Sequence, residues 1–184
     1  MSTKLDKFQA VVEVPEGVTV TLNKHMLQVQ GPLGKTFKSF KKIPVNLEVN
    51  DSKVQLRAQG SRKKDYAIMN TAKSIISNLC EGIVDGYTIK MKVVYAHFPV
   101  TVKIKDDLVL VENFQGERAA RIAKIVGQTK VNPKGDDVII TGAVLTDVTQ
   151  TAANIEQKTR IKRKDHRVFL DGIYVYEKNN GIEK

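Results

Sequence analysis

The densest group of charged side chains in this chain lies between Lys158 and Arg167, where Asp165 is the only acid. Its cations are Lys158, Arg160, Lys162, Arg163, Lys164 and Arg167. Like charges at this density repel one another unless a polyanion or solvent screens them. The planar fork of arginine also matches pairs of phosphate oxygens. The pattern predicts a phosphate-binding surface, and His166 inside it is a further candidate for contact with a phosphate or a base.

Residues for catalysis or metal binding do not form comparable groups. The three histidines, His25, His97 and His166, lie far apart and show no metal-ligand spacing. Cys80 follows Leu79 on an apolar helical pattern, where a cysteine is usually a small buried hydrophobe. The Gly31–Thr36 stretch ends like a phosphate loop but lacks its first glycine, so a hairpin turn is the better interpretation. We therefore predict no enzyme, no metal and no cofactor.

The composition fits a nucleic-acid partner but does not distinguish it from other anionic partners. The formal net charge is +10 and the sequence pI is about 9.6, values expected of nucleic-acid-binding domains. Further basic clusters occur at 35–42, 62–64 and 118–124. Membrane surfaces and acidic proteins would also be attracted. The sequence shows no apolar run of signal-peptide or membrane-spanning length, so a soluble cytoplasmic protein is expected.

An internal repeat predicts how this surface is positioned. Pro15, Gly31, Val54 and Gly86 recur about 85 residues later as Pro99, Gly116, Val138 and Gly172. We predict two tandem, duplicated α+β domains, 1–92 and 93–184, each an antiparallel β-sheet packed against one α-helix. The second domain would carry the main RNA-binding segment and a short C-terminal tail.

Strands are predicted wherever apolar and polar residues alternate. In the first half these stretches are 18–22, 27–29, 45–49 and 54–56, with a closing strand at 87–93; in the second half they are 100–104, 108–111 and 138–140. The turns between them are short, which favours antiparallel neighbours.

Each half also contains one helical pattern. The first has an apolar stripe that Gly82 is expected to end: Ile68, Ala72, Ile75, Ile76 and Leu79. The second starts at about Asp147, predicted as N-cap with Gln150 answering in a capping box. Its inward stripe is Val148, Ala152, Ile155 and Thr159.

Four motifs resemble one known family. The stretches QTAANIEQ (150–157), RIKRKDHRVFLDGIYV (160–175), YAHFPV (95–100) and ENFQGERAAR (112–121) are similar to ribosomal large-subunit protein six in its archaeal and eukaryotic branch, closer to the archaeal members. Gln115 and Ala120 stand where leucine and proline are expected. The resemblance covers essentially the whole chain and includes the duplication.

This resemblance implies a structural protein of the large ribosomal subunit that binds rRNA near the sarcin-ricin region and stabilises the area where translation factors dock. The implied partners are large-subunit rRNA and neighbouring ribosomal proteins, including the stalk base, with no membrane, no small-molecule substrate and no obligate homo-oligomer. Matching positions make phosphate contacts of Asn113, Arg118, Arg121, Arg160, Arg163, Lys164 and Arg167. Gln150 and Gln157 are implied as polar neighbours, and Lys158, Lys162 and His166 complete the predicted RNA-binding set.

Two other functions stay open on the sequence. The first domain could present exposed strands and loops as a protein-interaction module that recruits acidic partners. Alternatively, the chain could pack nucleic acid in general, including DNA. A platform that stacks single-stranded bases is disfavoured, because only 6% of the residues are aromatic and tryptophan is absent.

Overall fold

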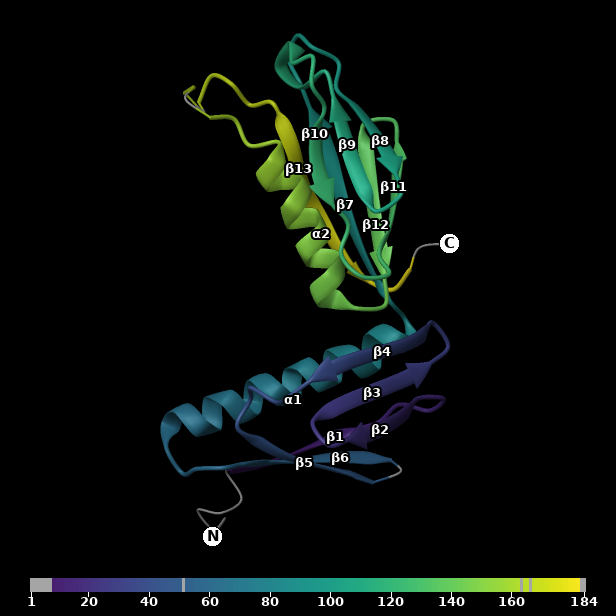
Figure 1. Cartoon of the computed structure of the whole chain (residues 1–184), viewed down its shortest axis with the longest axis vertical. Helices are drawn as coiled ribbons and strands as arrows, with labels where there is room; N and C mark the ends of the chain where they lie inside the picture. The colour runs from purple at the N-terminus through teal and green to yellow at the C-terminus, as the bar shows by residue number, and fades with distance from the viewer. Residues whose placement is uncertain (1–7, 51, 163, 166, 183–184) are drawn as a thin grey trace. The chain divides into compact units, whose positions relative to one another are not determined.

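The computed structural model of the chain describes residues 8–50, 52–162, 164–165 and 167–182. Its internal contacts divide it into two units, Met1–Asp85 and Gly86–Lys184. Both units combine antiparallel β-sheets with one long α-helix (Figure 1). The predicted α+β fold class is confirmed.

The first unit consists of six strands followed by a helix. In chain order these are β1 (Gln9–Glu13), β2 (Thr19–Asn23), β3 (Met26–Gly31), β4 (Gly34–Ser39), β5 (Val45–Asn50), β6 (Lys53–Ala58) and α1 (Lys63–Val84). The strands form two three-stranded sheets with the orders β2-β3-β4 and β1-β6-β5. Gly31 pairs with Gly34 at the turn between β3 and β4, so the Gly31–Thr36 stretch is a hairpin, as predicted.

Helix α1 packs its apolar stripe against strands of both sheets. Ala72, Ile76 and Leu79 from the predicted stripe are buried, and Cys80 is buried beside them. The predicted end at Gly82 is wrong, because Gly82 is a buried helical residue and the helix continues to Val84.

The second unit begins with a strand and ends with one. Its elements are β7 (Tyr87–Val94), β8 (Thr101–Lys105), β9 (Leu108–Glu112), the 3-10 turn η2 (Phe114–Gly116), β10 (Arg121–Lys124), β11 (Lys130–Lys134), β12 (Asp137–Gly142), α2 (Leu145–Lys158) and β13 (Gly172–Asn180). Two sheets result, with the orders β10-β9-β8 and β11-β12-β7-β13.

Helix α2 covers this second core with the predicted inward stripe. Val148, Ala152 and Ile155 are buried in a cluster with residues of β7, β9, β12 and β13. The predicted start of the helix is wrong, because its N-cap is Val144 and Asp147 lies inside the first turn. Gln150 does not answer in a capping box, and its side chain instead donates a hydrogen bond to Asn154.

Strand β7 belongs to the second unit and not to the first. We predicted a boundary after Lys92, with β7 closing the first domain, whereas the units divide after Asp85. The reason is that β7 pairs with β12 on one side and β13 on the other. The order β7-β12-β11 in the second unit therefore repeats β1-β6-β5 in the first, and β13 is an additional strand.

None of the helices within the described residues is both long enough and apolar enough to cross a membrane.

Candidate nucleic-acid interface

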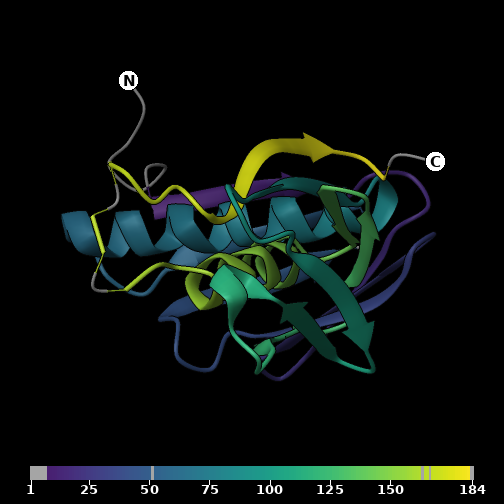
Figure 2. The ribbon, with the colours of Figure 1, turned by 90° about the horizontal axis from the view of Figure 1, so that it is seen from above.

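The predicted phosphate-binding cations lie mainly in residues 160–171, here called the basic segment, which connects α2 to β13. Figures 1 and 2 show this connection, yellow-green to yellow, extending away from the helix and the strand that it joins. Ile161 and Asp171 are buried near its two ends, and the described residues between them are exposed. The predicted site residues Arg163 and His166 lie outside the described residues. The described part of the segment is therefore an exposed loop with a buried base.

The end of the basic segment is attached to the chain just after β7 and to the start of β13. A carboxylate oxygen of Asp171 accepts a hydrogen bond from the amide of Ala96 at 3.1 Å. The hydroxyl of Tyr174 donates to the carbonyl oxygens of Leu170 and Asp171, at 3.2 and 3.3 Å. These bonds hold the position at which the exposed loop returns to the sheet.

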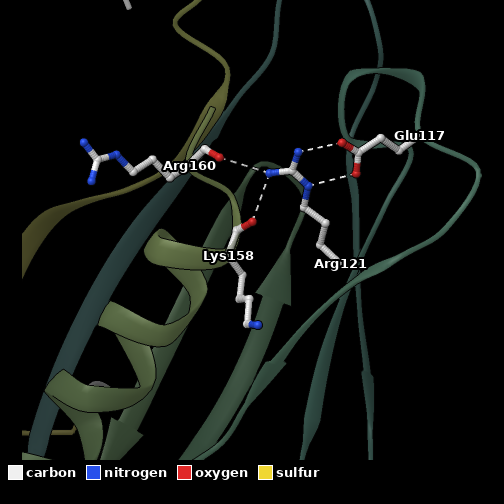
Figure 3. A network of polar contacts seen from close by, with 4 residues as sticks. All are labelled: Glu117, Arg121, Lys158 and Arg160. Carbon is white, nitrogen blue, oxygen red and sulfur yellow. Dashed lines mark hydrogen bonds and ion pairs between the residues drawn. The ribbon is translucent and has the colours of Figure 1, made fainter. Parts of the chain in front are cut away.

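The start of the segment is held by Arg121 of β10 (Figure 3). One guanidinium nitrogen, Nη1, donates to the backbone carbonyls of Lys158 and Arg160, at 3.0 and 3.2 Å. The other two nitrogens, Nε and Nη2, donate to the carboxylate of Glu117 at 2.9 and 2.6 Å. The guanidinium also lies over the buried ring of Phe114, 4.2 Å from its centroid. Every nitrogen of Arg121 is thus engaged within the protein.

This network, here called the Arg121 bracket, directs cations outward. In Figure 3 the carbonyl oxygens of Lys158 and Arg160 point toward Arg121, whereas their side chains point away from it. The carbonyl of Arg160 lies just beyond α2, and that of Lys158 lies at its C-terminal end, where helix carbonyls lack intrahelical partners and carry partial negative charge. A guanidinium satisfies both requirements at once. The bracket therefore fixes the backbone from which two predicted phosphate ligands project.

A shallow pocket lies beside the bracket. It is lined by Arg121, Ile122, Gln157, Lys158 and Lys162. Gln157, Lys158 and Lys162 are exposed and belong to the predicted RNA-binding set. The structure therefore brings together a polar amide and two ammonium groups around a surface without an acidic residue.

Two further predicted cations lie in the exposed part of the segment. The ammonium group of Lys164 lies 4.6 Å from the centroid of the Phe169 ring. Arg167 is paired with Asp165, with an Nη2 to Oδ2 distance of 2.8 Å, and its side chain is 90% exposed. An ion pair this exposed is weakened by solvent and by salt. Phosphate oxygens can therefore compete with Asp165 for Arg167.

The other predicted residues lie outside the pocket. Asn113 has a left-handed backbone with φ of 59°, and its side chain donates to the Pro99 carbonyl at 3.0 Å. Gln150 is engaged with Asn154 at 3.0 Å. Arg118 is exposed. The contacts of Asn113 are those of a turn-forming residue, whereas Arg118 presents a cation to solvent.

Sequence reasoning missed Glu117 and Phe114, the residues that hold Arg121. Hydrogen bonding to Arg121, and secondarily its positive charge, keeps the pKa of Glu117 below its usual value, although desolvation opposes this. The only sequence signal for the pairing of Glu117 with Arg121 is an acid four residues before an arginine. That spacing predicts contact on a helix, and these residues do not form a helix.

The described residues contain no group of three or more histidine, cysteine, aspartate or glutamate side chains placed to hold a metal ion. The cations and amides that line the pocket beside Arg121 can bind anions.

Comparisons with known proteins find a family model over part of the second unit and relatives over most of the chain. Residues 98–172 match the family model described as "Ribosomal protein L6". The protein named "Large ribosomal subunit protein uL6" of Methanobrevibacter smithii is 47% identical over 167 residues, covering 91% of this chain and 94% of the relative. Its namesake in Methanosarcina mazei is 44% identical over 91% of this chain and 95% of the relative. That of Staphylothermus marinus is 40% identical over 95% of this chain and 96% of the relative.

Proposed function

Because the chain belongs to the ribosomal protein L6 family, in its archaeal branch, we propose that it binds large-subunit rRNA through the basic segment and the end of α2. It would do so in the cytoplasm, as part of the large ribosomal subunit. The observation that carries the proposal is the Arg121 bracket. Its bonds to the carbonyls of Lys158 and Arg160 fix the backbone from which these cations project.

Preorganised cations are better RNA ligands than mobile ones. Lysine and arginine side chains lose rotamer freedom when they bind, and each immobilised side chain costs about 0.5–1.5 kcal/mol. A fixed backbone adds no further ordering cost at these positions. Contacts of this kind recognise the spacing of phosphates and the shape of a folded RNA more than its bases.

The finer role is that of a cross-link in folded rRNA near the sarcin-ricin region. Bound there, the protein would stabilise the area where translation factors dock, beside neighbouring ribosomal proteins that include the stalk base. The support for this location is family membership together with the placement of cations on the second unit. No catalytic step is involved, and the family is one of structural proteins.

The test is the salt dependence of RNA binding by the full chain. The probe is an rRNA fragment that contains the sarcin-ricin helix, and the variant is Lys158→Gln, Arg160→Gln, Lys162→Gln. If all three side chains neutralise phosphates, the slope of log K against log salt should become less steep by roughly 2, since fewer counterions are released. The control variant Lys105→Gln, Lys130→Gln, Lys134→Gln removes the same charge from exposed positions of the same unit.

An equal change in both variants would mean that only net charge matters, and the proposed interface would be wrong. A duplex DNA competitor separates RNA recognition from general packing of nucleic acid. Displacement of the rRNA fragment by equal amounts of unrelated duplex DNA would contradict the ribosomal role.

A further inference from the structure

The first unit has a basic groove of its own. Its walls come from the turn between β2 and β3, the connection between β4 and β5, β5 itself and the residue after β6. They include Lys24, His25, Lys41, Lys42, Asn46 and Gln59. None of the described residues that line the groove is acidic. We propose that this groove binds the phosphodiester backbone of RNA, as a second RNA contact distinct from the basic segment.

Within the described part of the chain, the ammonium groups of the groove form no ion pairs. Among the described residues, none of Lys24, Lys41 and Lys42 has an acidic partner within salt-bridge distance, although other lysines have one, as Lys53 has in Glu13 at 3.6 Å. Three unpaired cations around one concavity raise the local positive potential and attract a polyanion. Among the residues that the structure describes, the groove therefore has the charge of an anion site and no internal counterion that an anion would need to displace.

The backbone that carries these lysines is held in place. The amide of Phe40 donates to the carbonyl of His25 at 2.8 Å, which joins the β4–β5 connection to the β2–β3 turn. The amides of Ile43 and Val45 donate to the carbonyls of Phe40 and Ile43, at 2.9 and 2.8 Å. Phe40 and Val45 are themselves buried. The groove is thus a preformed surface on a packed support.

Hydrogen-bonding groups accompany the charges. The side chain of Gln59 donates to the side-chain oxygen of Asn46 at 3.1 Å, and both residues line the groove. Amide side chains beside ammonium groups suit phosphate and sugar oxygens, which accept hydrogen bonds as well as charge. An acidic peptide is the alternative ligand. It would offer these amide side chains only its carboxylates.

The second unit shows that the scaffold does not need these lysines. The β8–β9 turn occupies the topological place of the β2–β3 turn, and it contains Asp106 and Asp107 where the first unit has Lys24 and His25. Lys24 and Asp106 share a left-handed backbone, with φ of 57° and 52°. The same turn geometry thus carries opposite charges. Folding therefore does not explain the cations of the first unit, and a ligand does.

The β4–β5 connection supports the same conclusion. In the first unit it includes Lys41 and Lys42, whereas the corresponding connection between β10 and β11, residues 125–129, contains no lysine or arginine. The second unit therefore has a group of cations at the end of α2. The first unit has a group of cations at turns between strands.

Lysine acetylation of the full chain, read by mass spectrometry, tests the groove directly. The probes are a duplex RNA of mixed sequence and, separately, poly-glutamate. RNA should protect Lys24, Lys41 and Lys42 several-fold, and poly-glutamate should protect them much less. The exposed lysines Lys35, Lys64 and Lys73 of the same unit should react equally with and without RNA. Protection by poly-glutamate but not by RNA would overturn the proposal in favour of an acidic protein.

Acetylation also separates this proposal from the proposed function. Protection of Lys158 and Lys162 without protection of the groove would overturn the second contact and leave the first intact. Protection of the groove alone would overturn the contact through the basic segment and leave the groove contact intact. Protection of neither set of lysines would overturn both RNA contacts.

A matched pair of variants gives an independent measurement. Lys24→Gln, Lys41→Gln, Lys42→Gln should make the slope of log K against log salt less steep by roughly 2, while Lys35→Gln, Lys64→Gln, Lys73→Gln should leave it unchanged. Equal slopes for the two triple variants would overturn the proposal.

Discussion

The hydroxyl oxygen of Thr159 accepts a hydrogen bond from the amide of Ile173 at 3.2 Å. The same hydroxyl donates to the carbonyl of Ile155 at 3.0 Å. Both Thr159 and Ile173 are buried. Because Thr159 is the C-cap of α2 and Ile173 is the second residue of β13, this bond joins the chain just before the basic segment to the chain just after it. The exposed cations are therefore presented by a loop that is closed at its base.

Thr159→Val should destabilise the second unit, because it leaves the buried amide of Ile173 without an acceptor at nearly unchanged side-chain volume. An unsatisfied buried donor costs about 1–3 kcal/mol. Thr159→Ser retains the hydroxyl and should retain most of that bond's contribution. Urea unfolding of the two variants measures the difference. Equal free energies of unfolding for the valine and serine variants would show that the hydroxyl does not matter.

Arg121→Ala should weaken RNA binding without changing its salt slope, because the guanidinium is committed to carbonyls and to Glu117. Arg118→Ala is the matched comparison, since Arg118 is an exposed cation a few residues away. If Arg118 contacts a phosphate, its loss should make the slope less steep by about 0.7–0.9. Fluorescence anisotropy across a salt series measures both. A slope change in the Arg121 variant equal to that of Arg118 would identify Arg121 as a phosphate ligand instead.

Glu117→Gln should reduce stability at neutral pH and have less effect in acid. The pKa of Glu117 is lowered from its ordinary value of 4.5 by its bonds to Arg121, so the folded state favours the carboxylate. This contribution is present above that ordinary value and is lost as the pH falls through the lowered pKa. The carboxyl side chain is 42% exposed, so the difference at neutral pH should stay below about 1 kcal/mol. Urea unfolding at about pH 7 and about pH 3 tests it; a larger deficit in acid would contradict the sign.

Cys80 should be unreactive in the folded chain. Burial, and secondarily the charge of Glu81, raises the pKa of its thiol from 9.0 to about 11, and only the thiolate reacts with alkylating agents. Alkylation by iodoacetamide near pH 8 should be at least about 100-fold slower in the folded protein than in urea. Mass spectrometry follows the modified fraction. Comparable rates in the two states would mean that Cys80 is accessible.

The periodicity of the sequence predicted many of the strands and the inward faces of both helices, because burial on one face imposes a regular spacing on apolar residues. It did not predict β1, β10 or β11. The ends of the helices depended on contacts from elsewhere. Gly82 does not end α1, since the carbonyl of Ile83 accepts a hydrogen bond from the amide of Leu33. A Cβ on Gly31 would lie 2.8 Å from the Ile83 side chain, so Ile83 is packed there too. Partners in β3 and in the turn that follows it leave no signal in the helix sequence.

The candidate site could be predicted as a set of cations but not as an arrangement. Charge density identified Lys158 and Lys162, which the structure places around one pocket. The role of Arg121 could not be read from charge, because its carbonyl partners lie 37 and 39 residues away in sequence. In the sequence, an arginine exposed to solvent looks the same as an arginine that holds backbone carbonyls. Only the contacts distinguish a ligand for RNA from a support for other ligands.

The pairing of β7 decides where the chain can be divided. A fragment that starts after Lys92 would lose most of β7, which pairs with both β12 and β13. Such a fragment would expose the edges of two strands and would be prone to aggregate. Cleavage between Val84 and Tyr87 cuts no strand or helix. The same constraint applies to evolution, since a gene fusion or exchange that preserves both cores must have its junction in those few residues.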